Sequence, residues 1–239
     1  MPPVPPTDLP LYFEAVNSNS TVALISMLET APNLEYSTDG TTWQEWQHTT
    51  ADGTHTFDTL TLTAVGDRVY LRGDNQNGLG TMQEGAEMLL YSRFVMSGKI
   101  AAGGNIMSLL DKYTEMTEIQ AFGLMMLFGD ITGDNPNTSL TSAAAMPAVT
   151  TIGDQGCDSM YLGCTSLTSA AAMPAVTTIG EGGCDSMYNG CTFNMSDDGT
   201  TLNFAFPTPP VTAGETTYST AYDVAQWMGL YPATGHCAL

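Results

Sequence analysis

Basic residues are scarce in this sequence. Five lysines and arginines face 25 aspartates and glutamates in 239 residues, so the formal net charge is −20. All five basic residues lie between positions 68 and 112. Proteins bind nucleic acids and anionic membranes largely through lysine and arginine contacts to phosphate groups. We therefore expect no nucleic-acid partner, and a surface that is polar rather than ionic, because only 13% of the residues are charged.

Long apolar runs and an export signal are also missing. Residues 1–10 are rich in proline, whereas a secretory signal needs basic residues followed by an apolar stretch. No segment has the length and apolar content of a transmembrane span, so we expect no membrane insertion. We expect the protein to be made in the cytoplasm. The proline-rich arm is expected either to run extended and attach the chain to a neighbouring subunit, or to be a disordered terminus.

Motifs for catalysis are missing as well. There is no Gly-x-Ser-x-Gly, no phosphate-binding loop, and the three histidines lie apart from the cysteines in sequence. The cysteines are spaced by seven residues, which does not match Cys-x-x-Cys or Cys/His zinc sites. We expect a protein without enzymatic activity and without an organic cofactor.

The clearest feature that is present is an internal repeat. Residues 138–164 and 165–191 are two copies of one 27-residue unit and agree at 24 positions. Such units bury a shared core by stacking on one another. The copies differ at 154/181, 155/182 and 162/189, where we predict an exposed edge. A degenerate unit precedes them, in which we align residues 126–130 with residues 160–164.

Short alternating strands occupy the chain before the repeats. Residues 11–16 and 21–25 alternate or run apolar, and Asp39-Gly40 favours a tight hairpin turn. Six or more such segments within residues 11–104 predict a β-sandwich domain.

Helices are expected as caps on the repeats. Apolar residues at 106, 109, 110 and 113 have amphipathic helical spacing and predict a cap over the first unit. Residues 193–239 are the second expected cap, with a closing strand at 201–206 and a helix from Tyr218 to Met228.

Three sequence segments of the second copy resemble those of a known repeat family. Thr-Ser-Leu-Thr-Ser (165–169), Met-Pro-Ala-Val-Thr-Thr-Ile-Gly (173–180) and Cys-Asp-Ser-Met-Tyr-Asn-Gly-Cys (184–191) resemble the BspA-like leucine-rich repeats of gut and oral bacteria. The units are longer than is usual for that family, and alanines at 170–172 replace larger aliphatic residues. The resemblance implies a mainly β fold, in which the sandwich is followed by a short leucine-rich-repeat solenoid over residues 105–192. It also implies adhesion to proteins or glycans, because such repeats resemble the surface adhesin modules of Bacteroidales.

Stacking of the copies would align several side chains. Cys157 with Cys184, and Cys164 with Cys191, are each one repeat apart, and we favour buried, reduced thiols over disulfides. With Cys237 the chain has five cysteines.

Two sets of residues are candidate sites. Asp158 and Asp185 would lie one above the other, either as exposed carboxylates that accept hydrogen bonds from turn amides or as a calcium site to which Asp197-Asp198 could contribute. The aromatic residues are candidate platforms for a sugar ring, although a core ladder is the preferred interpretation for the last two; they are Trp43, Trp46, Tyr161 and Tyr188.

An adhesin-like sequence without an export signal is typical of a phage particle protein that is released by lysis. We therefore expect a non-enzymatic virion surface protein of a phage infecting gut bacteria: a capsid decoration, head fibre or adhesin. It is expected to be oligomeric, to contact other virion proteins through the proline-rich arm, and to bind a host-surface protein or glycan. A secreted or cell-surface adhesin and a purely structural virion subunit are the alternatives.

Overall fold

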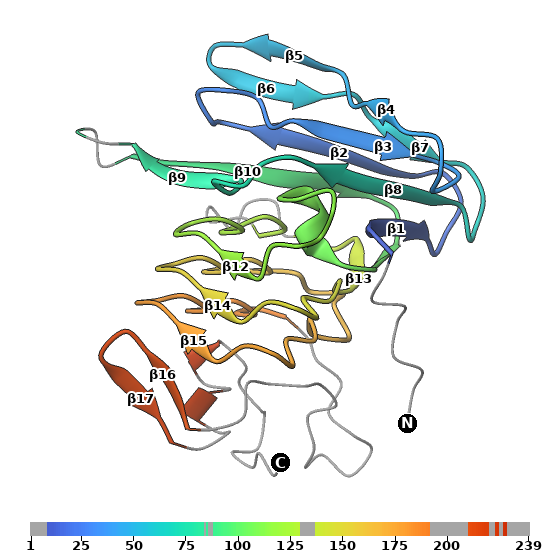
Figure 1. Ribbon diagram of the computed structural model, residues 1–239. Helices are drawn as coiled ribbons and strands as arrows, with labels where there is room; N and C mark the ends of the chain where they lie inside the picture. Colours follow the sequence, from blue (N-terminus) through green and yellow to red (C-terminus); the bar gives the residue numbers. More distant parts are fainter. Residues whose placement is uncertain are drawn as a thin grey trace, which may run out of the picture.

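The protein is mainly β. The computed structural model describes residues 9–83, 85, 88–129, 137–191, 210–219, 223–224 and 227–228. Within these residues the strands form three sheets (Figure 1). No helix in the described part of the chain is long and apolar enough to cross a membrane.

The first sheet has the strand order β13-β11-β1-β8-β3-β4. Its strands are β1 (Leu11–Ala15), β3 (Leu34–Ser37), β4 (Gln44–Glu45), β8 (Arg68–Gly73), β11 (Ile100–Gly103) and β13 (Leu140–Ser142). β13 belongs to the first repeat copy and pairs in parallel with β11, so this sheet continues from the N-terminal strands into the repeats.

The second sheet has the order β5-β6-β2-β10-β9, with β7 also paired to β2. Its strands are β2 (Ser20–Ser26), β5 (His48–Ala51), β6 (Thr54–Phe57), β7 (Leu60–Leu62), β9 (Gly80–Gln83) and β10 (Met88–Ser97). Every second residue of β1 and β2 is buried, as the alternating sequence predicts. The two sheets pack through aromatic rings, with Phe13 5.0 Å from Phe94 and Trp46 5.2 Å from Phe57 between centroids.

The hairpin predicted at Asp39-Gly40 is confirmed, but its turn is longer than predicted, because β3 ends at Ser37 and β4 begins at Gln44. β3 and β4 are antiparallel, with Glu35 opposite Glu45, and Gly40 has a φ of 74°. Asp39 accepts hydrogen bonds from the amides of Thr42 and Thr41. These bonds, with a further one from Ser37, hold the pKa of Asp39 well below its usual value.

The third sheet is built from rungs. β12 (Glu118–Ile119), β14 (Thr151–Ile152), β15 (Thr178–Ile179) and β16 (Val211–Ala213) are parallel neighbours, and β17 (Thr216–Tyr218) turns back antiparallel to β16. Ile152 lies opposite Ile179, 27 residues further along. The two repeat copies therefore stack in register, and Figure 1 shows β12, β14 and β15 one below another.

One aromatic ladder runs from the second sheet through the rungs. Centroid distances are 5.2 Å from Phe94 to Phe128, 5.0 Å from Phe128 to Tyr161, and 5.3 Å from Tyr161 to Tyr188. All four rings are buried. The N-terminal sheets and the rungs consequently share one hydrophobic core.

The alignment of the degenerate unit is wrong by one residue. The amide of Met126 donates to the carbonyl of Asp158 at 3.1 Å, so Met126 lies beside Ser159 and not beside Met160. Met126 and Ser159 also share a positive φ, of 55° and 52° respectively. Phe128, rather than Leu127, is therefore the equivalent of Tyr161.

The first expected capping helix is not found, although all of its residues are described. Residues 106–109 form one 3₁₀ turn (Ile106–Leu109) whose four residues are all buried. The turn therefore lacks the solvent-exposed face that an amphipathic helix would have. The first rung is instead covered by the second sheet, through hydrogen bonds from Leu79 to Gly123 at 2.6 Å and from Phe94 to Leu127 at 2.8 Å.

The C-terminal helix prediction is wrong in its start, because Tyr218 ends strand β17. Of its later residues, 223, 224 and 227 are helical, and the amide of Met228 donates to the carbonyl of Val224 at 3.0 Å; residues 220–222, 225 and 226 lie outside the described part of the chain. The strand predicted at 201–206, residues 1–8 of the arm, and Cys237 lie outside the described residues.

Candidate binding groove

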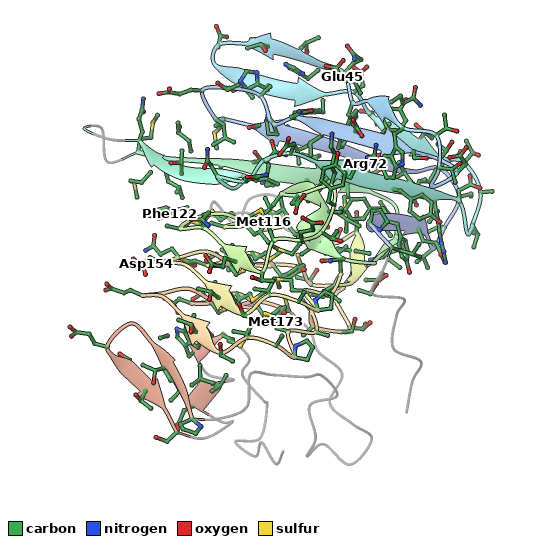
Figure 2. All side chains as sticks on the ribbon, viewed as in Figure 1. Glu45, Arg72, Met116, Phe122, Asp154 and Met173 are labelled. Atoms are coloured by element: carbon green, nitrogen blue, oxygen red, sulfur yellow. The ribbon has the colours of Figure 1, made fainter. Side chains whose placement is uncertain are left out.

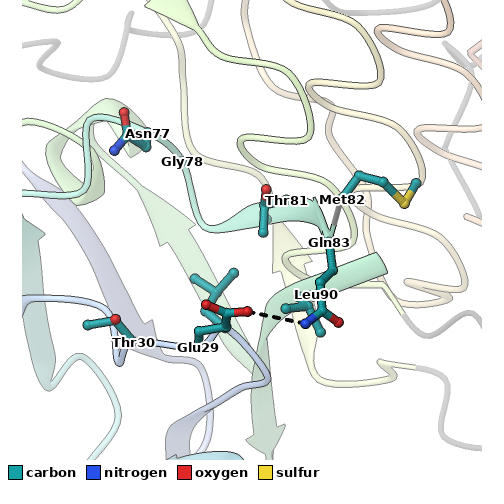
Figure 3. Close-up of a pocket in the computed structure, with 10 residues that line it drawn as sticks. Glu29, Thr30, Asn77, Gly78, Thr81, Met82, Gln83 and Leu90 are labelled. Carbon is teal, nitrogen blue, oxygen red and sulfur yellow. Dashed lines mark hydrogen bonds between the residues drawn. The ribbon is translucent and has the colours of Figure 1, made fainter. Parts of the chain in front are cut away.

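The hollows on the described surface include two that are lined in part by polar side chains. The smaller, about 380 Å³, lies between β9, β10 and residues 28–30 (Figure 3). Glu29 accepts a 3.2 Å hydrogen bond from Gln83 across it, and Met82 stands exposed at its edge. The larger, about 730 Å³, lies at the far end of the rungs. It combines charged and aromatic side chains, so we consider it the candidate site.

Three segments line this larger hollow, which we call the groove. The turns of the two copies contribute Gln155, Glu181, Gly182 and Asp185; the β16–β17 hairpin contributes residues 213–216 and Tyr218; and the C-terminal segment contributes Trp227. Segments that are distant in sequence therefore meet only because the rungs stack.

The rung turns leave room for the hairpin. Gln155 and Gly182 occupy the same turn position with φ values of 51° and 63°, a region that glycine adopts without strain. Gly182 has no side chain, and a Cβ added there would lie 3.3 Å from Cγ of Gln155. At Gly214 of the hairpin an added Cβ would lie 3.2 Å from Glu181. The hairpin thus packs against the turn of the last rung.

The groove carries three carboxylates, from Glu181, Asp185 and Glu215, all on exposed residues. Asp154, which projects from the edge of the rungs in Figure 2, accepts a 2.9 Å hydrogen bond from the amide of Glu181. No lysine or arginine occurs after position 112, so this half of the chain has no lysine or arginine of its own to neutralise these charges.

An aromatic pair forms another part of the lining. The rings of Tyr218 and Trp227 stack 4.7 Å apart at 15° and are half-buried. Burial raises the pKa of Tyr218, and the nearby charge of Asp185 raises it further. The backbone of Trp227 is fixed to the last rung by a 3.1 Å hydrogen bond from the amide of Ser186.

Three of the four predicted sugar platforms lie in the core. Tyr161 and Tyr188 are 0% exposed and Trp46 is 1% exposed, so no ligand can stack on them. The indole of Trp46 donates to the carbonyl of Asp58 at 2.7 Å. The core ladder that we preferred for Tyr161 and Tyr188 is therefore confirmed. The alternative of a sugar platform is wrong for these two rings and for Trp46, because each ring fills the space between sheets or rungs.

Trp43 is the exception and stays half-exposed. The guanidinium of Arg72 lies 4.0 Å from its ring centroid and covers one face. The same arginine forms a 2.6 Å ion pair with Glu35. Only the other face of Trp43 is therefore open to a ligand.

The calcium prediction rests on Asp158 and Asp185, which occupy the same position in adjacent rungs. Ser159 donates to the carboxylate of Asp158 at 2.6 Å. Burial raises the pKa of Asp158, and the charge of Asp185 adds to the increase. Among the residues that the structure describes, no three His, Cys, Asp or Glu side chains cluster closely enough to hold a metal ion. Asp197 and Asp198 lie outside them, and calcium stays a prediction.

The cysteines of the two copies are free thiols in the structure. Cys157, Cys164 and Cys184 are buried, and Cys191 is half-buried. A hydrogen bond with the Cys184 thiol and burial raise the pKa of Cys157. Burial raises the pKa of Cys191 to about 12.

The exposed edge predicted where the copies differ is found in part. Asp154, Glu181 and Asn189 are exposed, whereas Gln155, Gly182 and Leu162 are half-buried. Three of these six positions, Gln155, Glu181 and Gly182, line the groove. The aromatic pair was missed because no local pattern links it to the repeats.

Comparison of the chain with family models, with curated protein sequences and with solved structures gives no match.

Proposed function

We propose that this chain is a non-enzymatic binding protein on the surface of a phage particle. In this proposal the rungs are a BspA-like leucine-rich-repeat stack that presents the groove to a protein or glycan on a gut bacterium. The protein is a capsid decoration, head fibre or adhesin, and residues 1–10 attach it to other virion proteins.

The groove is the single observation that carries the proposal. Its volume of about 730 Å³ is within the size range of small-molecule and side-chain binding sites. A purely structural subunit has no need of such a hollow with charged and aromatic walls, so the groove favours a binding role over that alternative.

The shared core supports the same conclusion. The aromatic ladder from Phe94 to Tyr188 joins the rungs to the N-terminal sheets. Lys99 adds a polar link, because its ammonium donates to the carbonyl of Thr138 at 2.5 Å and to the hydroxyl of Ser166 at 2.6 Å. A binding face on a rigid body loses less conformational entropy on binding.

Two measurements test the proposal. Mass spectrometry of purified particles from the source of the gene is expected to find the chain, whereas its absence from particles contradicts virion display. Fluorescently labelled protein is expected to bind intact gut Bacteroidales cells saturably. Display without any saturable binding would favour the structural subunit, and binding without display would favour the secreted or cell-surface adhesin.

A further inference from the structure

We propose that the groove binds a cationic side chain, an arginine or lysine presented by a protein partner. This inference rests on the proposed binding function and specifies its ligand. It is argued from the groove's chemistry, from a matching arrangement elsewhere in the chain, and from the differences between the two repeat copies.

The polar side chains of the groove are mainly acceptors. Ionised Glu181, Asp185 and Glu215 can accept hydrogen bonds but cannot donate them. A guanidinium or ammonium group offers only donors and a positive charge, and therefore complements them. A neutral sugar hydroxyl both donates and accepts, and leaves three carboxylates without a counter-charge.

The aromatic pair adds a second interaction with a cation. Cations bind over the faces of tryptophan and tyrosine rings, and arginine also stacks flat on them. Tyr218 and Trp227 lie in the same groove wall as the carboxylates. Asp185 is close enough to Tyr218 to raise its pKa, so aromatic and acidic groups border one space.

The protein already holds its own arginines in this way. Arg72 lies over the ring of Trp43 at 4.0 Å and pairs with Glu35 at 2.6 Å. Arg68 repeats the arrangement, at 4.6 Å from the ring of Tyr12 and 2.5 Å from Glu14.

The groove supplies the same two partners, an aromatic face and carboxylates. No lysine, arginine or histidine is among the described residues that line it. Its arrangement is therefore suited to a cation from another molecule.

The repeat copies differ where this ligand would lie. They agree at 24 of 27 positions, yet two of the three differences involve lining residues. At 155/182 a glutamine becomes Gly182, which removes a side chain from the groove wall. At 154/181 an aspartate becomes Glu181, whose carboxylate reaches one methylene further. Both changes distinguish the last rung from the one before it.

Titration of the protein with N-acetyl-L-arginine amide tests the inference, with the neutral citrulline amide as the matched ligand control. Amide NMR follows the three tryptophan indole N–H signals, and Trp227→Phe assigns the signal of Trp227. We expect saturable shifts of this signal with the arginine amide and no saturable shift with citrulline amide.

Two triple variants remove the same charge from different places. The groove variant is Glu181→Gln, Asp185→Asn and Glu215→Gln; the control variant is Glu45→Gln, Asp52→Asn and Glu118→Gln, all exposed positions outside the groove. We expect the groove variant to weaken arginine binding at least tenfold and the control variant less than twofold. The single change Glu215→Gln, expected to weaken binding twofold or more, is the test if the triple groove variant does not fold.

Equal loss in both triple variants, or equal shifts with citrulline amide, would overturn the inference. So would a saturable shift with methyl glycosides and none with the arginine amide, which identifies a glycan site. If the wild-type protein adheres to cells but the arginine amide does not shift the Trp227 signal, this inference alone is contradicted. Arginine binding by a protein that neither adheres nor occurs on particles contradicts the proposed function alone.

Discussion

Tyr161 and Tyr188 occupy equivalent positions but have different hydrogen bonding. The hydroxyl of Tyr188 accepts a 3.0 Å hydrogen bond from the amide of Ala171. The hydroxyl of Tyr161 is buried and has no hydrogen-bond partner within the described part of the chain. The same substitution, tyrosine to phenylalanine, is therefore expected to have opposite effects in the two copies.

The magnitudes follow from the cost of burying a polar group. An unsatisfied buried hydroxyl costs about 1–3 kcal/mol, so Tyr161→Phe is expected to stabilise the protein by about 1 kcal/mol or more. Tyr188→Phe removes a bond and leaves the amide of Ala171 unsatisfied, at a cost of about 1–2 kcal/mol. The ring stacking is expected to persist in both variants, because a phenylalanine, Phe128, already occupies the equivalent position in the rung before Tyr161.

Urea unfolding of the wild type and both variants measures these differences. The expected gap between the two variants is about 2–5 kcal/mol in the free energy of unfolding, which urea titration resolves. Equal destabilisation by both substitutions would refute the reasoning, since it would show that the Tyr161 hydroxyl is satisfied in solution.

Three further predictions concern other buried or half-buried groups. Asp111 accepts hydrogen bonds from three backbone amides at 2.9 to 3.1 Å, so Asp111→Ala is expected to lower the free energy of unfolding by about 3 kcal/mol in urea titrations, and Asp111→Asn by less. Burial raises the pKa of Asp158 above its ordinary value of 3.8, so the stability that its protonated form contributes is present below pH 3.8 and lost as pH rises. Asp158→Asn should therefore unfold at higher temperature than the wild type at pH 7, with the difference vanishing near pH 3; an unchanged difference contradicts this. Because burial raises the pKa of Cys164, and that of Cys191 to about 12, iodoacetamide at pH 8 is expected to label them only after unfolding, as mass spectrometry of the digested protein would show.

Local patterns were sufficient where the structure depends on neighbours in sequence. Alternation predicted the buried faces of β1 and β2, and Asp39-Gly40 predicted the β3–β4 hairpin. The 27-residue period also predicted that Cys157 and Cys184 would lie on adjacent rungs, because an exact repeat fixes the stacking register.

Burial and long-range packing were the sources of the errors. Residues 106–109 have the spacing of an amphipathic helix, but this spacing does not reveal that all four side chains are buried between the first sheet and the rungs. The degenerate unit needed a 33-residue offset, which the repeated copies do not indicate.

The groove depends on packing of the same kind. Trp227 reaches it through backbone bonds between the last rung and residues 227–228, which no sequence period encodes. The difference between the copies at position 181 pointed to the carboxylate of Glu181, one of the groove residues. Nothing in the sequence pointed to the aromatic wall of the groove.

Adhesion of the two charge-matched triple variants to intact gut Bacteroidales cells tests the central claim most directly. The groove variant changes positions 181, 185 and 215, and the control variant changes positions 45, 52 and 118, of which Glu45 lies on the N-terminal sheets (Figure 2). If the groove is the binding site, the groove variant loses at least tenfold in cell binding and the control variant binds like the wild type. Equal binding by the two variants would contradict a binding role for the groove.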